Sequence, residues 1–411
     1  MTPSKTVVVI NQYAMPRDRW GLTRNADLFS RLTDWRPRIL SGARDHYSQK
    51  TFTTTDPLFT LLPVPAYQGN GRKRMLGWVV FAAEAALKGV RTPDLALTYG
   101  SSPHLLAAVA ALAVARVRRV PMVIEVRDLW PESIVASGNL RRGSRLHKAL
   151  VALEKGLYER AAHIVTVTDG WESHFASLGI PADKVTTIPN GTDVDAFASD
   201  LPREELRALH GIEGFTAVYA GAHGPANGLG QVLDAAAALP GVQFLLIGAG
   251  AERAALIERA RTEGLTNVTF REPIAKAELG GLLAACDVGI HVLAPWDLLS
   301  AGLSPNKLFD YMAAGLPVVS NCGDGLRDVV TDGTCGRIGG WDDLTLLVGD
   351  VAAASPEQRA AWGRAGRQLV RERFSRDAAA AALAGVLDAA VGRRTRTRTR
   401  TRTRTRTRQA A

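Results

Sequence analysis

Residues 304–320 read SPNKLFDYMAAGLPVVS, a helical stretch that a proline opens and a glycine closes, followed directly by a short apolar run. Ser304 is the expected N-cap and Pro305 the expected first helical residue, because proline has no N–H group to leave unpaired there. The apolar run 317–320 is expected to be a buried strand. Buried strands that are separated by helices form parallel sheets with both faces covered. This stretch therefore predicts an α/β fold.

The same alternation occurs in two series along the chain. The first series of expected strands comprises residues 6–10, 95–99, 121–126, 163–168 and 185–189, and the second comprises residues 216–220, 242–247, 268–271, 288–292 and 317–320. Each series predicts a doubly wound, Rossmann-like parallel sheet. Ligands of such sheets bind beyond the carboxyl ends of the strands, so we expect a site in a central cleft between two facing domains.

The turn IPNGTDVD at 188–195 separates the two series, because Pro-Asn-Gly interrupts regular structure. We therefore expect an N-terminal domain over 1–191 and a C-terminal domain over 192–375. A helix over 376–391 can complete either domain. To complete the first, it would cross back from the C-terminal domain to the N-terminal one. The Arg-Thr repeat within 392–411 is expected to be disordered by its own charge repulsion.

Composition excludes several classes of protein. The 411 residues are 46% hydrophobic, which excludes a disordered chain, and the three cysteines are too few and too scattered for a disulfide framework. Nine arginines of the C-terminal repeat account for most of the formal charge of +10, which is +1 without them. The apolar stretch 105–117 falls short of the ~20 residues of a membrane span. We expect a core helix there, with a membrane-associated helix as the alternative, and a reducing, cytoplasmic location.

The helix that starts near residue 304 has the features of a phosphate site. Backbone N–H groups at a helix start attract phosphate. Lys307 and Asp310 lie three residues apart and therefore on one face of this helix. They could offer a cation to a diphosphate and a carboxylate to ribose hydroxyls. An ordinary surface ion pair would explain the same spacing.

This segment resembles the donor-site helix of family 4 glycosyltransferases, whose GT-B fold has two Rossmann-like domains around a cleft. Further segments share the resemblance and extend it over nearly all of the chain up to about residue 391: the Gly-containing loop 19–24, VIEVRDLWPES at 123–133, IPNGTDVDAF at 188–197, YAGAHGPANGL at 219–229 and FREPI at 270–274. DLWPES together with PNKLFDYMAAG is similar to the bacterial surface-polysaccharide branch, which includes transferases of N-acetylated amino and deoxy sugars. The resemblance implies a nucleotide sugar as the donor substrate, no further cofactor and no metal.

The resemblance also implies a donor site in the C-terminal domain. In the family one acidic residue holds ribose and another, eight residues earlier, approaches the sugar; here these positions are Asp310 and Gly302. Many relatives carry an Arg and a Lys in the loop at 219–229, and this chain does not, so Lys307, Arg253 or backbone N–H groups must meet the phosphate charge. The expected donor-binding residues are Gly21, Gly221, His223, Asn227, Arg253, Ile274, Gly302, Leu303, Lys307 and Asp310.

The end of the strand at 123–133 is expected to face the cleft from the N-terminal domain. Arg127 and Asp128 stand where many relatives have His-Asp. The resemblance implies that Arg127 stabilises a diphosphate and that Asp128 orients or deprotonates the acceptor hydroxyl. With Lys307 they form the expected catalytic set, and Glu132 and Asn190 are expected on the acceptor side or between the domains. A structural ion pair at the strand end is the alternative for Arg127 and Asp128.

Other motifs do not support other chemistry. Asp193 and Asp195 form a D-x-D pair, but they lie in the interdomain turn, where the family has the same spacing without a metal. Gly248 and Gly250 follow an expected strand, yet the third glycine of a dinucleotide fingerprint is absent. The histidines show no metal-ligand spacing, and no nucleophile motif of a hydrolase occurs.

The sequence thus predicts a retaining, metal-independent glycosyltransferase that moves a hexosyl or N-acetylhexosaminyl group from a nucleotide diphosphate, UDP before GDP. The expected acceptor is a lipid-linked or growing surface-polysaccharide glycan. A nucleotide-sugar 2-epimerase on the same fold and a basic nucleic-acid-binding protein that relies on the repeat are the alternatives, although no specific nucleic acid is expected as a partner.

A lipid-linked acceptor would bring the protein to an anionic membrane, on the inner face of the plasma membrane. The stretch 72–88 has the basic start and apolar body of an interfacial helix, although an ordinary helix with a solvated end has the same pattern. The Arg-Thr repeat would also be attracted to anionic lipid. A repeat expansion without a selected role is the other interpretation of that tail.

Overall fold

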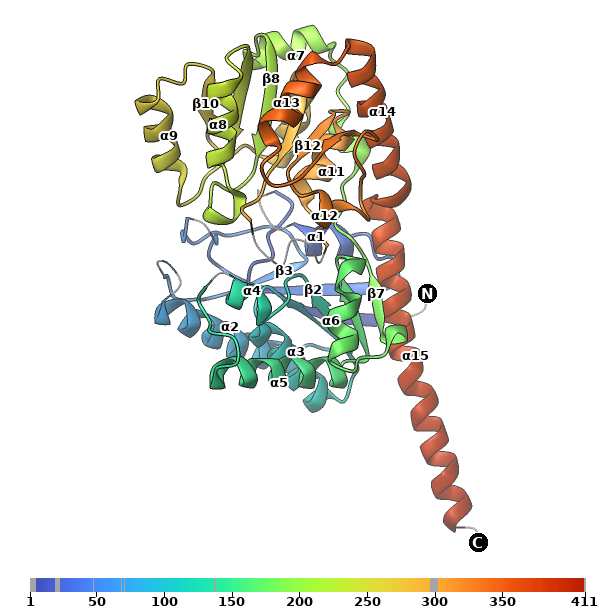
Figure 1. The fold of residues 1–411 in the computed structure, drawn as a ribbon. Coiled ribbons are helices and arrows are strands. Elements are labelled where there is room, and N and C mark those ends of the chain that lie inside the picture. The colour runs from blue at the N-terminus through green and yellow to red at the C-terminus, as the bar shows by residue number, and fades with distance from the viewer. Residues whose placement is uncertain are drawn as a thin grey trace.

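The computed structural model describes residues 5–18, 23–46, 48–67, 69, 71–136, 138–295 and 302–409, and the side chains of 276–277 and 393–409 are not described. Gly21, an expected donor contact, lies outside these residues. Figure 1 shows two α/β domains, with the N-terminal one below and the C-terminal one above. Along one side of the molecule, α14 (Pro356–Arg373) lies beside the C-terminal domain and α15 (Arg376–Gln409) continues beside the N-terminal one.

The N-terminal domain is built on a parallel sheet whose described strands have the order β3-β2-β1-β4-β5-β6-β7. The strands are β1 (Lys5–Ile10), β2 (Trp35–Gly42), β3 (Phe59–Leu62), β4 (Leu95–Ser102), β5 (Met122–Val126), β6 (His163–Thr166) and β7 (Val185–Thr187). In the centre, Val9 of β1 lies opposite Ile39 of β2 and Tyr99 of β4. The strand order reverses between β1 and β4, which is where an open sheet of this kind binds its ligand.

Two strands of this sheet were not predicted. The sequence of β2, WRPRILSG, contains a proline and two arginines, and a proline argues against an internal strand. The missed strand pairs with β1 on one side and with the four-residue strand β3 on the other. Two arginines and the proline follow the buried Trp35 and interrupt the apolar pattern, so a local pattern could not identify the strand.

Helices cover both faces of the N-terminal sheet. On one face, α2 (Arg72–Val90), α3 (Leu105–Arg118) and α5 (Arg145–Arg160) share an apolar core with the strands. On the other face lie α1 (Arg24–Phe29) and the first part of α15 (Arg376–Gln409). The remaining short elements are α4 (Glu132–Ala136), α6 (Glu172–Ser177), η1 (Asp169–Trp171) and η2 (Ala182–Lys184). The helix α3 confirms the core helix expected at 105–117.

The C-terminal domain has a second parallel sheet, whose described strands have the order β10-β9-β8-β11-β12-β13. The strands are β8 (Phe215–Ala220), β9 (Val242–Ile247), β10 (Val268–Arg271), β11 (Val288–His291), β12 (Val318–Ser320) and β13 (Gly336–Ile338). The covering elements are η3 (Val194–Phe197), α7 (Arg203–His210), η4 (Pro225–Asn227), α8 (Gly230–Ala238), α9 (Arg253–Thr262), α10 (Lys276–Ala285), α11 (Asn306–Ala313), α12 (Gly323–Leu326), α13 (Leu344–Ala353) and α14 (Pro356–Arg373). Two apolar cores, one on each face, confirm the second Rossmann-like domain.

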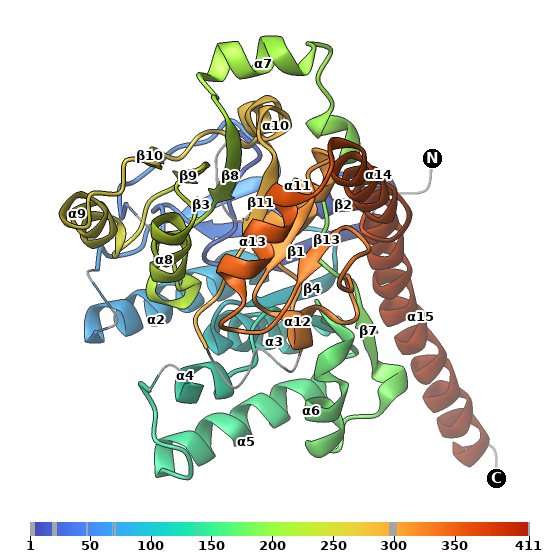
Figure 2. The same cartoon turned by 45° about the horizontal axis from the view of Figure 1, so that its top comes forward.

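The helix α15 starts where the chain leaves the C-terminal domain. The residues just before it meet the interdomain turn, since the Thr192 N–H donates to the Phe374 carbonyl at 3.0 Å. Leu383 and Leu387 of α15 then pack into the core of the N-terminal domain. The helix continues through the Arg-Thr repeat to Gln409, where charge repulsion led us to expect disorder. Extending an existing helix needs no new nucleus, which favours this continuation. Figure 2 shows α14 and α15 following one another along this side of the molecule.

Among the described residues, no helix combines the length and the apolar character that crossing a bilayer requires.

Candidate functional site

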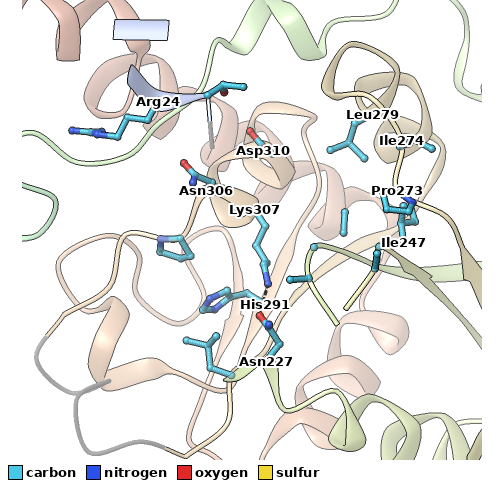
Figure 3. Close-up of a pocket in the computed structure, with 18 of the residues that line it drawn as sticks. Arg24, Asn227, Ile247, Pro273, Ile274, Leu279, His291, Asn306, Lys307 and Asp310 are labelled. Atoms are coloured by element: carbon cyan, nitrogen blue, oxygen red, sulfur yellow. Dashed lines mark hydrogen bonds between the residues drawn. The ribbon is translucent and has the colours of Figure 1, made fainter. Parts of the chain in front are cut away.

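A pocket of about 480 Å³ opens between the two domains. Its C-terminal-domain wall consists of the ends of β8, β9 and β11, the segment after β10, and the first turns of α11. From the other side, Thr23 and Arg24 at the start of α1 and Arg376 at the start of α15 line it. Figure 3 shows Lys307 and Asp310 of α11 projecting into this space. The pocket thus lies beyond the carboxyl ends of the strands, as parallel sheets predict.

The start of α11 differs from the prediction in one respect. The helix begins at Asn306 with Pro305 as its N-cap, and Ser304 makes no capping bond. The Ser304 Oγ instead accepts the Asn190 N–H at 2.8 Å, and its carbonyl accepts the Asn190 side-chain amide at 2.6 Å. The expected cap therefore joins the segment before α11 to the interdomain turn, and Asn190 holds an interdomain position.

Lys307 reaches from α11 across the floor of the pocket. Its Nζ donates to the Tyr219 hydroxyl at 2.7 Å and to the Asn227 Oδ1 at 3.1 Å, and it lies 4.2 Å from the centre of the Tyr219 ring. Burial lowers the pKa of Lys307 to about 7. A side chain at Gly221 would come within 3.1 Å of the Lys307 Nζ, so glycine leaves the ammonium group its space. An anion in this pocket would restore the charge that burial disfavours.

Asp310 lies one turn further along α11, and its residue is 8% exposed. Figure 3 shows Lys307 extending away from Asp310, toward Asn227. The carboxylate and the ammonium group therefore address different parts of the pocket. Ile274, another expected donor contact, lines the pocket together with Pro273 and Leu279 and makes one end of it apolar.

His223 lies behind the pocket wall. It is fully buried between Tyr219 and Phe270, with ring centres 5.9 and 6.2 Å away. Burial, and then the charges of Arg253 and Lys307, lower the pKa of His223 to about 4. Its backbone joins the ends of β8 and β9, since its N–H donates to the carbonyl of residue 249 at 2.9 Å. The structure thus gives His223 a supporting position rather than one on the pocket surface.

Arg253, at the start of α9, forms an ion pair with Glu272 at 2.8 Å and does not line the pocket. Leu303 packs onto the core of the C-terminal domain, and its N–H donates to the Gly325 carbonyl at 2.8 Å. Of the ten expected donor residues, Gly221, Asn227, Ile274, Lys307 and Asp310 meet at the pocket surface.

Gly302, in the loop before α11, lies against the N-terminal domain. Its φ is +103°, and a side chain there would come within 2.6 Å of the Thr168 Oγ1 and 3.1 Å of the Gly170 Cα. A glutamate, which relatives are expected to have at this position, does not fit in this arrangement. The close contact of the two domains therefore gives a physical reason for the glycine.

The expected catalytic pair lies at the end of β5. Burial lowers the pKa of Arg127, with Glu125 acting in the opposite direction. The side chain of Asp128 reaches solvent, but the surrounding protein removes enough water to raise its pKa, and Arg127 opposes that rise. Glu132 lies at the start of α4 and pairs with His147 at 3.3 Å, as well as with Arg142 at 2.5 Å.

Sequence reasoning missed a buried ion pair beside this strand. The Arg24 Nε donates to Glu125 at 2.9 Å, and its two other nitrogens donate to the carbonyls of Ile188 and Pro189 at 2.6 and 2.8 Å. Burial alone would raise the pKa of Glu125, but Arg24 and Arg127 lower it to about 2. A glutamate inside the apolar strand VIEV was the available signal, because a buried carboxylate needs a partner.

An aromatic cluster beyond the N-terminal sheet was also missed. The Trp78 ring of α2 stacks on His104 at 5.2 Å and meets Trp130 edge-on at 5.5 Å. The Trp78 Nε1 donates to the Tyr13 hydroxyl at 2.8 Å. Tyr13, His104 and Trp130 follow β1, β4 and β5, so the cluster lies at the same edge of the sheet as Arg127 and Asp128.

Comparisons with known proteins agree with this architecture. Residues 18–191 match the model of the glycosyl transferase 4-like domain, and residues 214–354 match that of the glycosyl transferases group 1. TuaH of Bacillus subtilis, named for teichuronic acid biosynthesis, is 26% identical over 201 residues, 48% of this chain and 49% of the relative. A GDP-mannose-dependent phosphatidylinositol monomannoside mannosyltransferase of Mycolicibacterium smegmatis is 29% identical over 248 residues, 57% of this chain and 63% of the relative. The alignments thus span less than two thirds of the length of these two relatives.

A solved structure has the same fold over nearly the whole chain. HepE of Anabaena, in complex with UDP and glucose, superposes with a TM-score of 0.71 at 19% identity and covers 94% of this chain and 100% of its own. At that identity the likeness shows the fold alone. Two domain models on two Rossmann-like sheets leave one conclusion: the chain belongs to the glycosyltransferases of GT-B fold, with a glycosyl transferase 4-like domain followed by a group 1 domain.

Proposed function

We propose that the protein is a retaining, metal-independent glycosyltransferase that transfers a sugar from a nucleoside diphosphate, UDP before GDP, to a lipid-linked or growing surface-polysaccharide glycan. The observation that carries this proposal is the pair Lys307 and Asp310 on one helix in the interdomain pocket. Lys307 meets the diphosphate, and Asp310 accepts hydrogen bonds from the ribose hydroxyls. The apolar end around Ile274 receives the base.

The relatives support this proposal and leave the base of the donor open. The HepE structure contains UDP and glucose, whereas the mycobacterial relatives are named for GDP-mannose. The names of TuaH and of WcaI of Escherichia coli refer to teichuronic acid and colanic acid biosynthesis, which favours a polysaccharide acceptor.

Transfer with retention needs no enzymic nucleophile. The acceptor oxygen forms its bond to the anomeric carbon on the face from which the diphosphate oxygen leaves. The acceptor proton passes to that leaving phosphate oxygen, and the nucleoside diphosphate departs. Asp128 orients the acceptor hydroxyl, and Arg127 and Lys307 stabilise the negative charge that develops on the diphosphate. The backbone N–H groups at the start of α11 add to this charge stabilisation.

Substitution of Asp310 tests the donor site. Asp310→Ala should raise the donor KM by roughly ten- to hundredfold, since a ribose contact is worth about 1–3 kcal/mol. Asp342→Ala, at an exposed position of the same domain, is the matched control. Steady-state kinetics with UDP-glucose, UDP-N-acetylglucosamine and GDP-mannose measure the effect, and an unchanged KM for the preferred donor would remove Asp310 from the site.

A second assay, without acceptor, separates transfer from epimerisation. Purified protein is incubated with UDP-N-acetylglucosamine and no acceptor, and the nucleotide sugars are resolved by chromatography. A transferase leaves the donor unchanged or slowly releases UDP. Conversion into a second nucleotide sugar would contradict the proposal and support a 2-epimerase.

A further inference from the structure

Arg376 opens α15, the helix that links the C-terminal domain to the N-terminal one. Its residue is 3% exposed, and it lines the interdomain pocket. Arg376 comes directly after Ser375, whose backbone pairs with that of Thr192 in the interdomain turn. The main chain is therefore fixed on both segments that connect the domains. A long cationic side chain is therefore buried at a junction of three elements: α1, α11 and α15.

One side of the Arg376 guanidinium has a partner. Its Nη2 lies 3.1 Å from the Asp27 Oδ2 of α1, and the same carboxylate oxygen accepts the Thr23 hydroxyl at 2.9 Å. The other terminal nitrogen, Nη1, is buried and has no hydrogen-bond partner among the described residues. A buried donor without an acceptor is unfavourable, and more so when it is charged. Such a group is therefore expected to have an acceptor in the working protein.

The surroundings of Arg376 indicate where that acceptor would come from. Burial lowers its pKa, while the charges of Asp27 and, more weakly, Asp310 act in the opposite direction. Arg376 thus lies in the field of the carboxylate that we assign to ribose, and both residues line the same pocket. Arg24 also lines it, but its nitrogens are committed to Glu125 and to backbone carbonyls.

We propose that Arg376 is a donor-binding residue, whose Nη1 donates a hydrogen bond to an oxygen of the nucleoside diphosphate bound in the pocket. The inference rests on the proposed function, because it needs a nucleotide in the site. It assigns the terminal helix a direct part in binding: the ligand connects α11, which carries Lys307 and Asp310, to α15 and through Asp27 to α1. Donor binding then holds the two domains together.

A purely structural role is the competing explanation, since the ion pair with Asp27 also attaches α15 to α1. The two explanations differ in what happens when only that pair is broken. Asp27→Asn removes the ion pair and leaves the Arg376 Nη1 unchanged. A structural role predicts similar losses for the Asp27 and Arg376 variants, whereas donor binding predicts a loss of nucleotide affinity in the Arg376 variant that clearly exceeds the other.

The experiment measures binding of UDP, GDP and uridine to the full-length protein by isothermal titration calorimetry. The variants are Arg376→Met, Arg376→Lys, Asp27→Asn and the surface control Arg371→Met, each checked by thermal unfolding without ligand. We expect Arg376→Met to bind the preferred diphosphate roughly ten- to hundredfold more weakly, as for a charge-assisted hydrogen bond. Arg376→Lys should recover part of the loss and serves as the second variant if the methionine variant does not fold.

The affinity for uridine shows whether Arg376 contacts a phosphate oxygen or a ribose oxygen. If Arg376 contacts a phosphate oxygen, uridine affinity stays unchanged in Arg376→Met, and if it contacts ribose, uridine and UDP lose affinity by the same factor. Diphosphate binding within twofold of the wild type in both Arg376 variants, or an equal loss in Asp27→Asn, would overturn the inference while the proposed function stands. A wild-type protein that binds neither UDP nor GDP would overturn the proposed function and the inference with it.

Discussion

Lys307 is held in the pocket by two neutral partners, Tyr219 and Asn227, rather than by a carboxylate that would keep it charged. Its pKa of about 7 in the free protein follows from burial. A diphosphate bound in the pocket would raise that pKa again, because a nearby negative charge favours the ammonium form. Above pH 7, we therefore expect binding of the nucleotide to take up a proton.

This linkage predicts that donor affinity falls as pH rises. Between pH 7 and 9, the Kd of the nucleoside diphosphate should increase by up to about tenfold per pH unit, because the free protein loses the proton that the complex retains. Calorimetry in two buffers of different ionisation enthalpy would measure the proton uptake directly. Lys307→Met should bind more weakly and lose this pH dependence; a wild-type affinity that is constant from pH 7 to 9 would contradict the assignment.

At the scale of single elements, α2 presents an unusual surface for a helix of a globular domain. Met75, Leu76, Val79 and Leu87 are each 55–56% exposed, and Arg72 and Lys73 at its start are exposed as well. The opposite side of the helix carries Gly77, Phe81 and Ala85 into the core. The helix therefore combines a packed face with a basic and apolar outer face, the composition of an interfacial helix.

We expect this outer face of α2 to bind anionic membranes. Reversing the charges in Arg72→Glu/Lys73→Glu should weaken binding to phosphatidylglycerol-containing vesicles by at least about thirtyfold, at roughly 1 kcal/mol per basic residue near the surface. Vesicle flotation at low and high salt measures the effect. Arg364→Glu/Arg371→Glu on α14 is the matched control of equal charge change.

The contribution of the Arg-Thr repeat is tested separately in the same flotation experiment, with a truncated protein. A protein that lacks residues 393–411 should still float with anionic vesicles if α2 is the binding element. Loss of flotation on this deletion alone would assign the membrane role to the repeat. Flotation of neither the full chain nor the shortened one would contradict both assignments.

At the scale of the whole molecule, the two domains meet closely at Gly302. A Cβ atom there would come within 2.6 Å of the Thr168 Oγ1, and the φ of +103° is unfavourable for any other residue. Gly302→Ala should therefore destabilise the protein by about 1–3 kcal/mol and separate the domains at this contact. Gly385→Ala in α15 is the matched control, because a side chain there meets no atom within 4 Å.

The two alanine variants are expected to shift thermal unfolding in opposite directions. Gly302→Ala should unfold at a lower temperature and bind UDP more weakly. Gly385→Ala should gain about 0.5–1 kcal/mol from the better helix propensity of alanine. A Gly302→Ala protein with wild-type stability and wild-type nucleotide affinity would show that this contact does not hold the domains.

The sequence by itself determined the repeated strand–helix alternation, the two Rossmann-like domains and the helix that carries Lys307 and Asp310. These features depend on local patterns, since apolar runs and helix starts are properties of neighbouring residues. The strand β2 was not predicted because Pro37 and its flanking arginines interrupt the apolar pattern, and only pairing with β1 makes it a strand.

Only the tertiary structure decided the contacts between distant segments. Ser304 was expected to cap its own helix, yet it binds Asn190, which is 114 residues away in the sequence. His223 was expected to contact the donor, but its side chain is buried beneath the residues that line the pocket. Arg376, in contrast, lines the pocket from the start of the terminal helix. Burial and hydrogen-bond partners depend on which elements fold against each other, and a local pattern contains no information about that choice.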